Sequence, residues 1–99
     1  MKQTENDVNQ QSVKILKALS DDIRLGIAKH VASTPGLVPS CDVVQSCARR
    51  LELSQPAMSH HFKKLVNAGV LLIEKHGTEN FYRYNKKLCK QHGIDITKL

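Results

Sequence analysis

The segment from Ser54 to Gly69 constrains the fold more than any other part of the chain. Ser54 can cap a helix with its hydroxyl group, and Pro56 in the first turn costs no helical hydrogen bond. Apolar residues then recur at helical spacing at Met58, Phe62 and Leu65. Because glycine readily adopts the left-handed conformation that ends many helices, Gly69 marks the end. The segment predicts a helix over residues 54–68 with one buried face.

The opposite face of this helix is polar and basic. Steps of about 100° per residue place on it the side chains of Pro56, Ser59, His60, Lys63, Lys64 and Asn67. No acidic residue occurs from Leu53 to Ile73, although a helix exposed only to water usually alternates Glu with Lys. Hydroxyl, imidazole and amide groups can read base edges, and ammonium groups can contact phosphates. The exposed face therefore favours contact with a nucleic acid.

Three further helices are predicted before this one. The first covers residues 8–19, and the second is capped by Ser20 and ends near Ala32. Residues 33–39 contain Pro and Gly and predict a connecting loop. Ser40 can cap the third helix, whose buried stripe is Val44, Cys47, Ala48 and Leu51. A short turn joins it to residues 54–68, which makes a helix-turn-helix.

A β-hairpin is predicted after Gly69. Residues 71–75 and 81–84 are rich in β-forming residues, and residues 76–80 form a polar loop with one Gly. A short helix follows at residues 86–92. The expected fold is mainly α with a β-hairpin wing, a winged helix-turn-helix over residues 8–92. Residues 1–7 are predicted to be a flexible tail, and residues 93–99 a C-terminal tail.

The net charge of +6 lies in one half of the chain. Residues 1–48 hold five basic and five acidic residues, whereas residues 49–90 hold nine basic and three acidic ones. A separate basic region is typical of proteins that bind nucleic acids. The hairpin tip extends this basic region with four side chains: Lys75, His76, Thr78 and Asn80. Side chains at such a tip can lie along the DNA backbone or the minor groove.

Several other classes of protein fit the sequence less well. Ninety-nine residues leave no room for a separate substrate domain, and no nucleophile motif or phosphate-binding glycine loop is present, so we do not expect an enzyme. A winged helix that binds proteins is the main alternative, but it needs aromatic anchors and only 4% of the residues are aromatic. The first residues are polar and no apolar run is long enough for a membrane span. We therefore expect a cytoplasmic protein without membrane contact, and double-stranded DNA as its partner.

The segment Leu53-Ser-Gln-Pro-Ala-Met-Ser-His-His-Phe-Lys-Lys-Leu65 resembles the recognition helix of the arsenic-repressor (ArsR/SmtB) family of bacterial regulators. Residues 16–25, 67–71 and 74–84 resemble the family as well. The resemblance implies a homodimeric repressor that binds a palindromic operator and releases it when a small inducer, often a metal ion, binds. It also implies that four positions contact DNA: Ser54, Gln55, Ser59 and His60. For Pro56, Lys63, Lys64 and the hairpin tip, the prediction rests on the residues themselves.

The inducer sites common in that family are incomplete in this sequence. Many relatives carry Cys-x-Cys-Asp where this chain has Pro39-Ser40-Cys41-Asp42, so one of the two cysteines is missing. Other relatives use Asp and His on a long last helix, and no His-x-x-His occurs here. We therefore predict neither a metal site nor a cofactor, and no inducer is identified. One alternative stays open, a thiol-sensing or redox-sensing repressor that uses Cys41 and Cys89.

Overall fold

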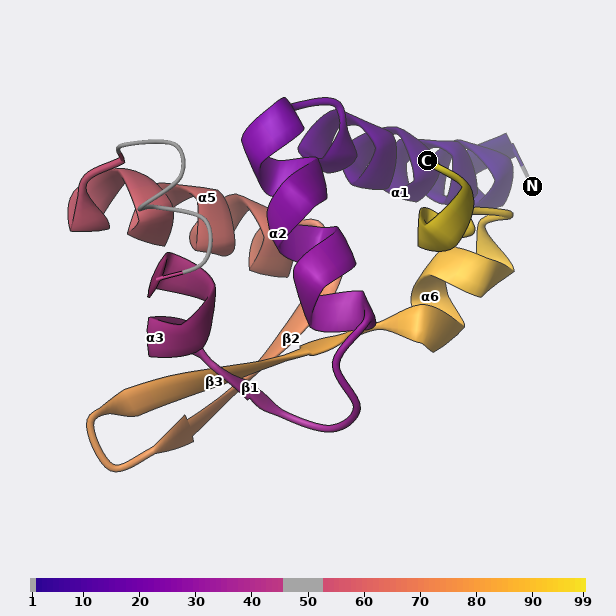
Figure 1. Cartoon of the computed structure of the whole chain (residues 1–99). Coiled ribbons are helices and arrows are strands. Elements are labelled where there is room, and N and C mark those ends of the chain that lie inside the picture. The colour runs from indigo at the N-terminus through magenta and orange to yellow at the C-terminus, as the bar shows by residue number, and fades with distance from the viewer. Residues whose placement is uncertain (1, 46–52) are drawn as a thin grey trace.

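The computed structural model describes the backbone of residues 2–45 and 53–99, and the side chains from residue 10 onward within those ranges. Figure 1 shows a group of helices on one side of a small antiparallel sheet. The helices are α1 (Lys2–Leu19), α2 (Asp22–Ala32), α3 (Ser40–Val43), α5 (Gln55–Asn67) and α6 (Lys86–Gln91), followed by the short 3₁₀ helix η2 (Ile96–Lys98). The strands are β1 (Val38–Pro39), β2 (Leu71–His76) and β3 (Glu79–Tyr84), in the order β1-β3-β2. The fold predicted from the sequence is confirmed.

The helix predicted over residues 54–68 has the expected bounds and caps. The hydroxyl oxygen of Ser54 accepts a hydrogen bond from the Ala57 amide at 3.3 Å, and Pro56 lies in the first turn. Gly69 follows with a φ of 87°, in the left-handed region. These local signals were sufficient because each acts within a few residues of the helix end.

Two helix starts differ from the prediction. Asp21, and not Ser20, caps α2, because its carboxylate accepts the Arg24 amide at 3.0 Å. Ser20 instead donates its hydroxyl to the Lys17 carbonyl at 2.8 Å. Likewise α3 begins at Ser40 itself, with Pro39 as its cap. The chain passes directly from β1 into α3, so Ser40 is already helical.

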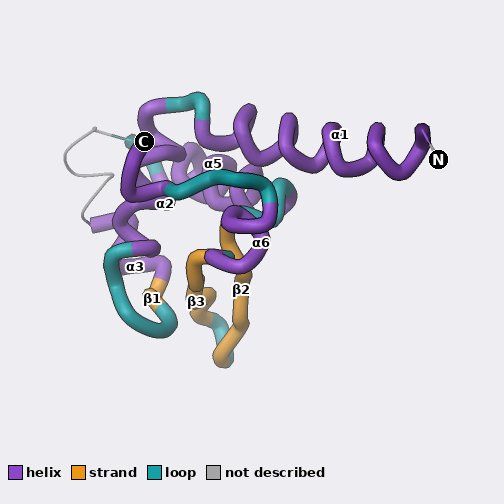
Figure 2. The backbone as a smooth tube through the Cα atoms, turned by 90° about the vertical axis from the view of Figure 1, so that its right-hand side faces the viewer, coloured by secondary structure: helices purple, strands orange, loops and turns teal. Residues whose placement is uncertain are grey.

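Helix α1 begins at Lys2, whereas the sequence predicted a tail over residues 1–7 and a helix from residue 8. Figure 2 shows the first half of α1 extending away from the rest of the molecule. Residues 2–7 are all polar or charged, so the apolar periodicity that marks the other helices is missing there. At the other end of the chain, where a tail was predicted, Ile96 is buried in the core.

The sheet has one strand that the sequence did not reveal. Residues 38–39 were predicted as loop, but Val38 pairs with Tyr82 and Pro39 with Phe81. A strand of two residues is too short for an alternating pattern, and Pro39 fits because β1 is an edge strand. The hairpin loop is also shorter than predicted. His76 pairs with Glu79, which leaves a two-residue turn of Gly77 and Thr78.

The core forms where α5, α2, α1 and the sheet meet. Met58, Phe62 and Leu65 of α5 are buried, as predicted. The rings of Phe62 and Tyr82 stack with their centroids 4.4 Å apart, which joins α5 to β3. Of the stripe predicted for the third helix, Val44 packs against the core, and Cys47, Ala48 and Leu51 lie outside the described residues. No helix among the described residues is long and apolar enough to span a membrane.

We predict that Gly69→Ala destabilises the protein and that Gly26→Ala does not. A Cβ atom on Gly69 would lie 2.6 Å from the Leu88 Cδ2 atom, and its φ of 87° is unfavourable for alanine. The backbone conformation alone should lower the free energy of unfolding by about 1–2 kcal/mol. Gly26 lies inside α2 with open space around it, so alanine there should raise that free energy by roughly 0.5–1 kcal/mol. Urea unfolding measures the free energy of unfolding of both variants. Equal effects of the two substitutions would contradict the different roles that we assign to Gly69 and Gly26.

Candidate nucleic-acid interface

Helix α5 separates its residues into a buried face and an exposed face, as the sequence predicted. The apolar residues face the core, and the polar and basic residues face solvent. Five residues near the start of the helix or in its first turns are exposed: Ser54, Gln55, Pro56, Ser59 and His60. Lys63, Lys64 and Asn67 continue the exposed face toward its end. The predicted DNA-binding residues of α5 therefore form one continuous surface.

The hairpin brings Asn80 beside α5, and Lys75, which pairs with Asn80, lies on the same face of the hairpin. Lys75, His76 and Thr78 are exposed at or near the tip, and Asn80 is half-buried. His76 is already engaged, because its Nε2 atom lies 2.9 Å from the Glu74 Oε1 atom and its ring meets Phe81 edge to face. The hairpin therefore offers Lys75 and Thr78 as its free polar groups.

A cleft of about 220 Å³ lies between α5 and the hairpin. Ser59 and Lys63 line it from α5, and Asn80 and Tyr82 line it from β3. The Oδ1 atom of Asn80 is buried without a hydrogen-bond partner. A buried acceptor without a partner costs free energy. The cleft joins the two predicted parts of the interface, which are far apart in the sequence.

The interface is strongly positive because its cations lack acidic partners. Within residues 10–45 and 53–99, two Asp or Glu carboxylates lie within 4.0 Å of a basic side chain: Asp21, 4.0 Å from His61, and Glu74, 2.9 Å from His76. Apart from Lys29, whose ammonium group contacts the C-terminal oxygen of Leu99, lysine and arginine side chains in that part of the chain have no carboxylate within 4.0 Å. Surfaces of one sign concentrate counter-ions and attract polyanions. The exposed side of α5 is suited to a phosphate backbone.

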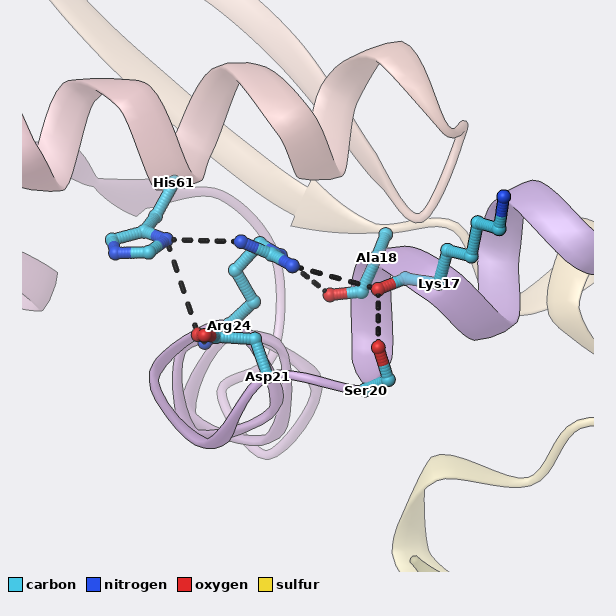
Figure 3. Close-up of polar contacts among 6 residues, drawn as sticks. All are labelled: Lys17, Ala18, Ser20, Asp21, Arg24 and His61. Carbon is cyan, nitrogen blue, oxygen red and sulfur yellow. Dashed lines mark hydrogen bonds and ion pairs between the residues drawn. The ribbon is translucent and has the colours of Figure 1, made fainter.

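Polar contacts fix α5 to the junction of α1 and α2, as Figure 3 shows. The guanidinium group of Arg24 donates to the Ala18 carbonyl at 2.8 Å, and its Nη1 atom lies 3.3 Å from the Nδ1 atom of His61 on α5. Burial lowers the pKa of His61 below its ordinary value, so the ring is neutral near pH 7 and can accept this hydrogen bond. His61 therefore has a structural position between α5 and the junction of α1 and α2.

The two described cysteines lack the setting that the thiol-sensing alternative requires. The thiol of Cys41 donates to the Glu79 carboxylate, with sulfur and oxygen 3.1 Å apart. That hydrogen bond raises the pKa of Cys41, and burial raises the pKa of Cys89, which is fully buried. A reactive cysteine needs an exposed, electropositive site because the thiolate is the nucleophile. Among the described residues, no group of three His, Cys, Asp or Glu side chains could hold a metal ion.

The fold and the exposed basic face of α5 define a winged helix-turn-helix DNA-binding regulator. Residues 42–71 match the family described as "Bacterial regulatory protein, arsR family". A relative named "Arsenical resistance operon repressor", from Staphylococcus xylosus, is 35% identical over 84 residues, which cover 83% of this chain and 75% of the relative. The chain belongs to the ArsR family of bacterial regulatory proteins, a family of regulators and not of enzymes.

Other comparisons agree with this assignment. A "Cadmium resistance transcriptional regulatory protein CadC homolog" from Staphylococcus aureus is 38% identical over 78 residues, or 79% of this chain and 60% of that longer protein. The homodimeric winged helix-turn-helix DNA-binding domain of a possible ArsR-family regulator from Mycobacterium bovis has a TM-score of 0.71 at 18% identity, with 90% of this chain and 78% of that one covered. Reduced HlyU from Vibrio cholerae has a TM-score of 0.65 at 23% identity, with 94% and 92% covered. Because their identities to this chain are only 18% and 23%, the two solved structures support the fold alone.

Sequence reasoning missed the basic residues that the first half of the chain contributes to this side of α5. Lys14, Lys17 and Arg24 lie in the half whose net charge is zero, yet they line the same hollow as Lys64. The spacing of Lys14 and Lys17 places them near each other on α1, which was the available signal. Because the charges of residues 1–48 sum to zero, the charge count did not reveal this basic pair.

We predict that Cys41 reacts slowly with iodoacetamide near pH 8, and that Glu79→Gln accelerates the reaction. The Glu79 carboxylate raises the Cys41 pKa, so removing its charge lowers that pKa and increases the thiolate fraction. Mass spectrometry that resolves each cysteine measures the rates, and Asp42→Asn is the matched control with a smaller expected effect. A Cys41 that already reacts faster than a free thiol in the unchanged protein would contradict this assignment.

Proposed function

We propose that this protein is a homodimeric transcriptional repressor that inserts α5 into the major groove of a palindromic operator. The observation that carries the proposal is the division of α5 into a fully buried apolar face and an exposed face that contains no carboxylate. A helix that only bordered solvent would gain nothing from excluding acidic residues. Relatives named as repressors of resistance operons support the repressor role.

The proposed roles follow the chemistry of each side chain. The N-terminal residues of a recognition helix enter the groove first, which favours base contacts by Gln55, Ser59 and His60. Ser54 and Pro56 lie at the same end. Lys63 and Lys64 offer charge to the phosphates on either side. At the hairpin, Lys75 and Thr78 would contact the backbone, whereas His76 would have to leave Glu74 and Asn80 would act from inside the cleft.

The proposed dimer contact is α1. Two large apolar side chains of α1, Val13 and Leu16, are 46% and 52% exposed, which is unfavourable in a monomer. Because α1 extends beyond the body of the molecule (Figure 2), a partner can reach this face without displacing the core. A two-fold dimer would place two α5 helices on half-sites about 10–10.5 base pairs apart. Such a repressor would act in the cytoplasm.

The test is fluorescence anisotropy with DNA from upstream of the protein's own gene and a scrambled duplex of the same composition. We expect tight binding to the upstream duplex and weaker, strongly salt-dependent binding to the scrambled one. Equal binding to both would leave a basic surface without sequence recognition and contradict the repressor role. Absence of binding to both would favour a winged helix that binds proteins.

Substitutions on α5 separate base readers from phosphate contacts. Ser59→Ala and His60→Ala should each lose about 1–3 kcal/mol of discrimination between the two duplexes. Lys63→Ala should weaken binding to both duplexes equally. Because the dimer carries two copies of Lys63, the salt slope should fall by about 1.8. The same anisotropy assay measures all three variants. If the lysine and the polar variants lose discrimination alike, the division of roles is wrong.

Substitution of Leu16 tests the dimer. Leu16→Glu should weaken association at least about tenfold, because a carboxylate would be buried in an apolar contact. Sedimentation velocity over a range of protein concentrations measures the shift toward monomer. Leu37→Glu is the matched control, since Leu37 is an exposed leucine of the loop before β1. A dimer that survives Leu16→Glu as well as Leu37→Glu does not form through this face of α1.

A further inference from the structure

A second hollow borders α5, with a volume of about 380 Å³. It lies between α5, the end of α1 and the start of α2. Its floor is alanine, and its rim holds four cationic side chains and one amide: Lys14, Lys17, Arg24, Lys64 and Asn67. No carboxylate lines it. We refer to it as the cationic hollow.

The cations of the cationic hollow have no close carboxylate partner within the described residues. None of the four has a carboxylate within 4.0 Å there. Asp21 attracts Arg24 from a longer distance, but its carboxylate already accepts the Arg24 backbone amide at 3.0 Å and lies 4.0 Å from His61. Four like charges around one hollow repel one another, and an anion in the hollow would relieve that repulsion. The site therefore has the electrostatics of an anion site.

Arg24 is held in place without losing its charge. Its Nε and Nη2 atoms donate to the carbonyls of Ala18 and Lys17 at 2.8 and 3.5 Å, and Nη1 contacts the neutral ring of His61 (Figure 3). All three partners are uncharged. A guanidinium group has five N–H donors, so two remain for a ligand. A fixed guanidinium group with free donors is well suited to phosphate oxygens.

The position of the cationic hollow on α5 identifies the source of the phosphate. Lys64 and Asn67 belong to the exposed face of α5, whereas Lys63 and Ser59 line the cleft on the hairpin side. The two hollows thus flank the face that we propose to enter the major groove. A helix in that groove lies between two phosphate backbones, so each flank faces one of them. The open shape also suits a phosphate on a polymer better than a small molecule, which is usually enclosed.

The proposed dimer contact leaves the Lys14 side of the cationic hollow accessible. With Ile15 pointing into the core, Leu16 and Lys14 lie on opposite flanks of α1, about 160° apart. A partner that covers Leu16 therefore does not cover Lys14. Lys17 lies about 40° from Val13 and borders the dimer contact.

We infer that the cationic hollow binds a phosphate group of the DNA backbone, on the side of α5 away from the hairpin. The inference rests on the proposed function and adds contacts from α1 and α2, outside the helix-turn-helix and the wing. Lys14 and Lys17 supply charge, and Arg24 supplies directed hydrogen bonds. These residues contact no base, so they strengthen binding to every DNA sequence equally.

The test is the salt dependence of DNA binding by the double variant Lys14→Gln/Lys17→Gln. The proposed dimer has two cationic hollows, each of which binds one phosphate group. Each lost phosphate contact lowers the slope of log K against log salt by about 0.9, so we expect a decrease of about 1.8. Between 50 and 200 mM salt, the unchanged protein should lose about tenfold more affinity than the variant. Affinity for the operator and for the scrambled duplex should fall by the same factor. Thermal melting of both proteins checks that the fold is retained.

The matched control is Lys87→Gln/Lys98→Gln, which removes the same two charges from exposed positions on α6 and η2. Its slope should remain that of the unchanged protein. If the Lys14/Lys17 variant behaves like this control while Lys63→Ala lowers the slope, the cationic hollow binds no phosphate and the proposed function stands. If the unchanged protein binds neither duplex, both the proposed function and this inference are overturned.

Discussion

The stacking of Phe62 on Tyr82 is the contact on which the DNA-binding surface depends. Their ring planes are 2° apart, with the centroids at 4.4 Å, and both rings are buried. Phe62 comes from α5 and Tyr82 from the central strand of the sheet, which pairs on one side with β1 and on the other with β2. One aromatic pair therefore sets the distance between the helix and the hairpin. The cleft that brings Ser59 and Asn80 together exists because of that distance.

Much of the fold could be predicted because it depends on local chemistry. The caps of α5, its buried stripe and the left-handed Gly69 each act within one or two turns, and the sequence displays them directly. The predictions that failed concern either a choice between two neighbouring residues or a pairing partner that is far away in the sequence. Asp21 and Ser20 are both good capping residues, and their side-chain contacts decided between them. Strand β1 exists through its pairing with β3, which lies more than 40 residues further on.

The candidate site was predicted where one helix carries it and missed where the fold assembles it. Steps around α5 were enough to place Ser59, His60 and Lys63 on an exposed face. No such rule predicts that Lys14 and Arg24 line the same hollow as Lys64, because their positions depend on how α1 and α2 cross α5. The environment of Cys41 was equally hidden, since Glu79 reaches this residue of α3 from β3. Charge summed along the chain is thus a poor guide to charge gathered in space.

The C-terminal end of α5 is tied to two other parts of the chain. Gln11 of α1 donates its side-chain amide to the Ala68 carbonyl at 2.9 Å, and Asn85 donates to the Gly69 carbonyl at 3.0 Å. Helix α5 therefore cannot pivot independently of α1. In a dimer built on α1, a change of a few degrees between the two α1 helices would be magnified along the length of each subunit. The distance between the two α5 helices of the dimer is then set by the contact between the two α1 helices at the symmetry axis.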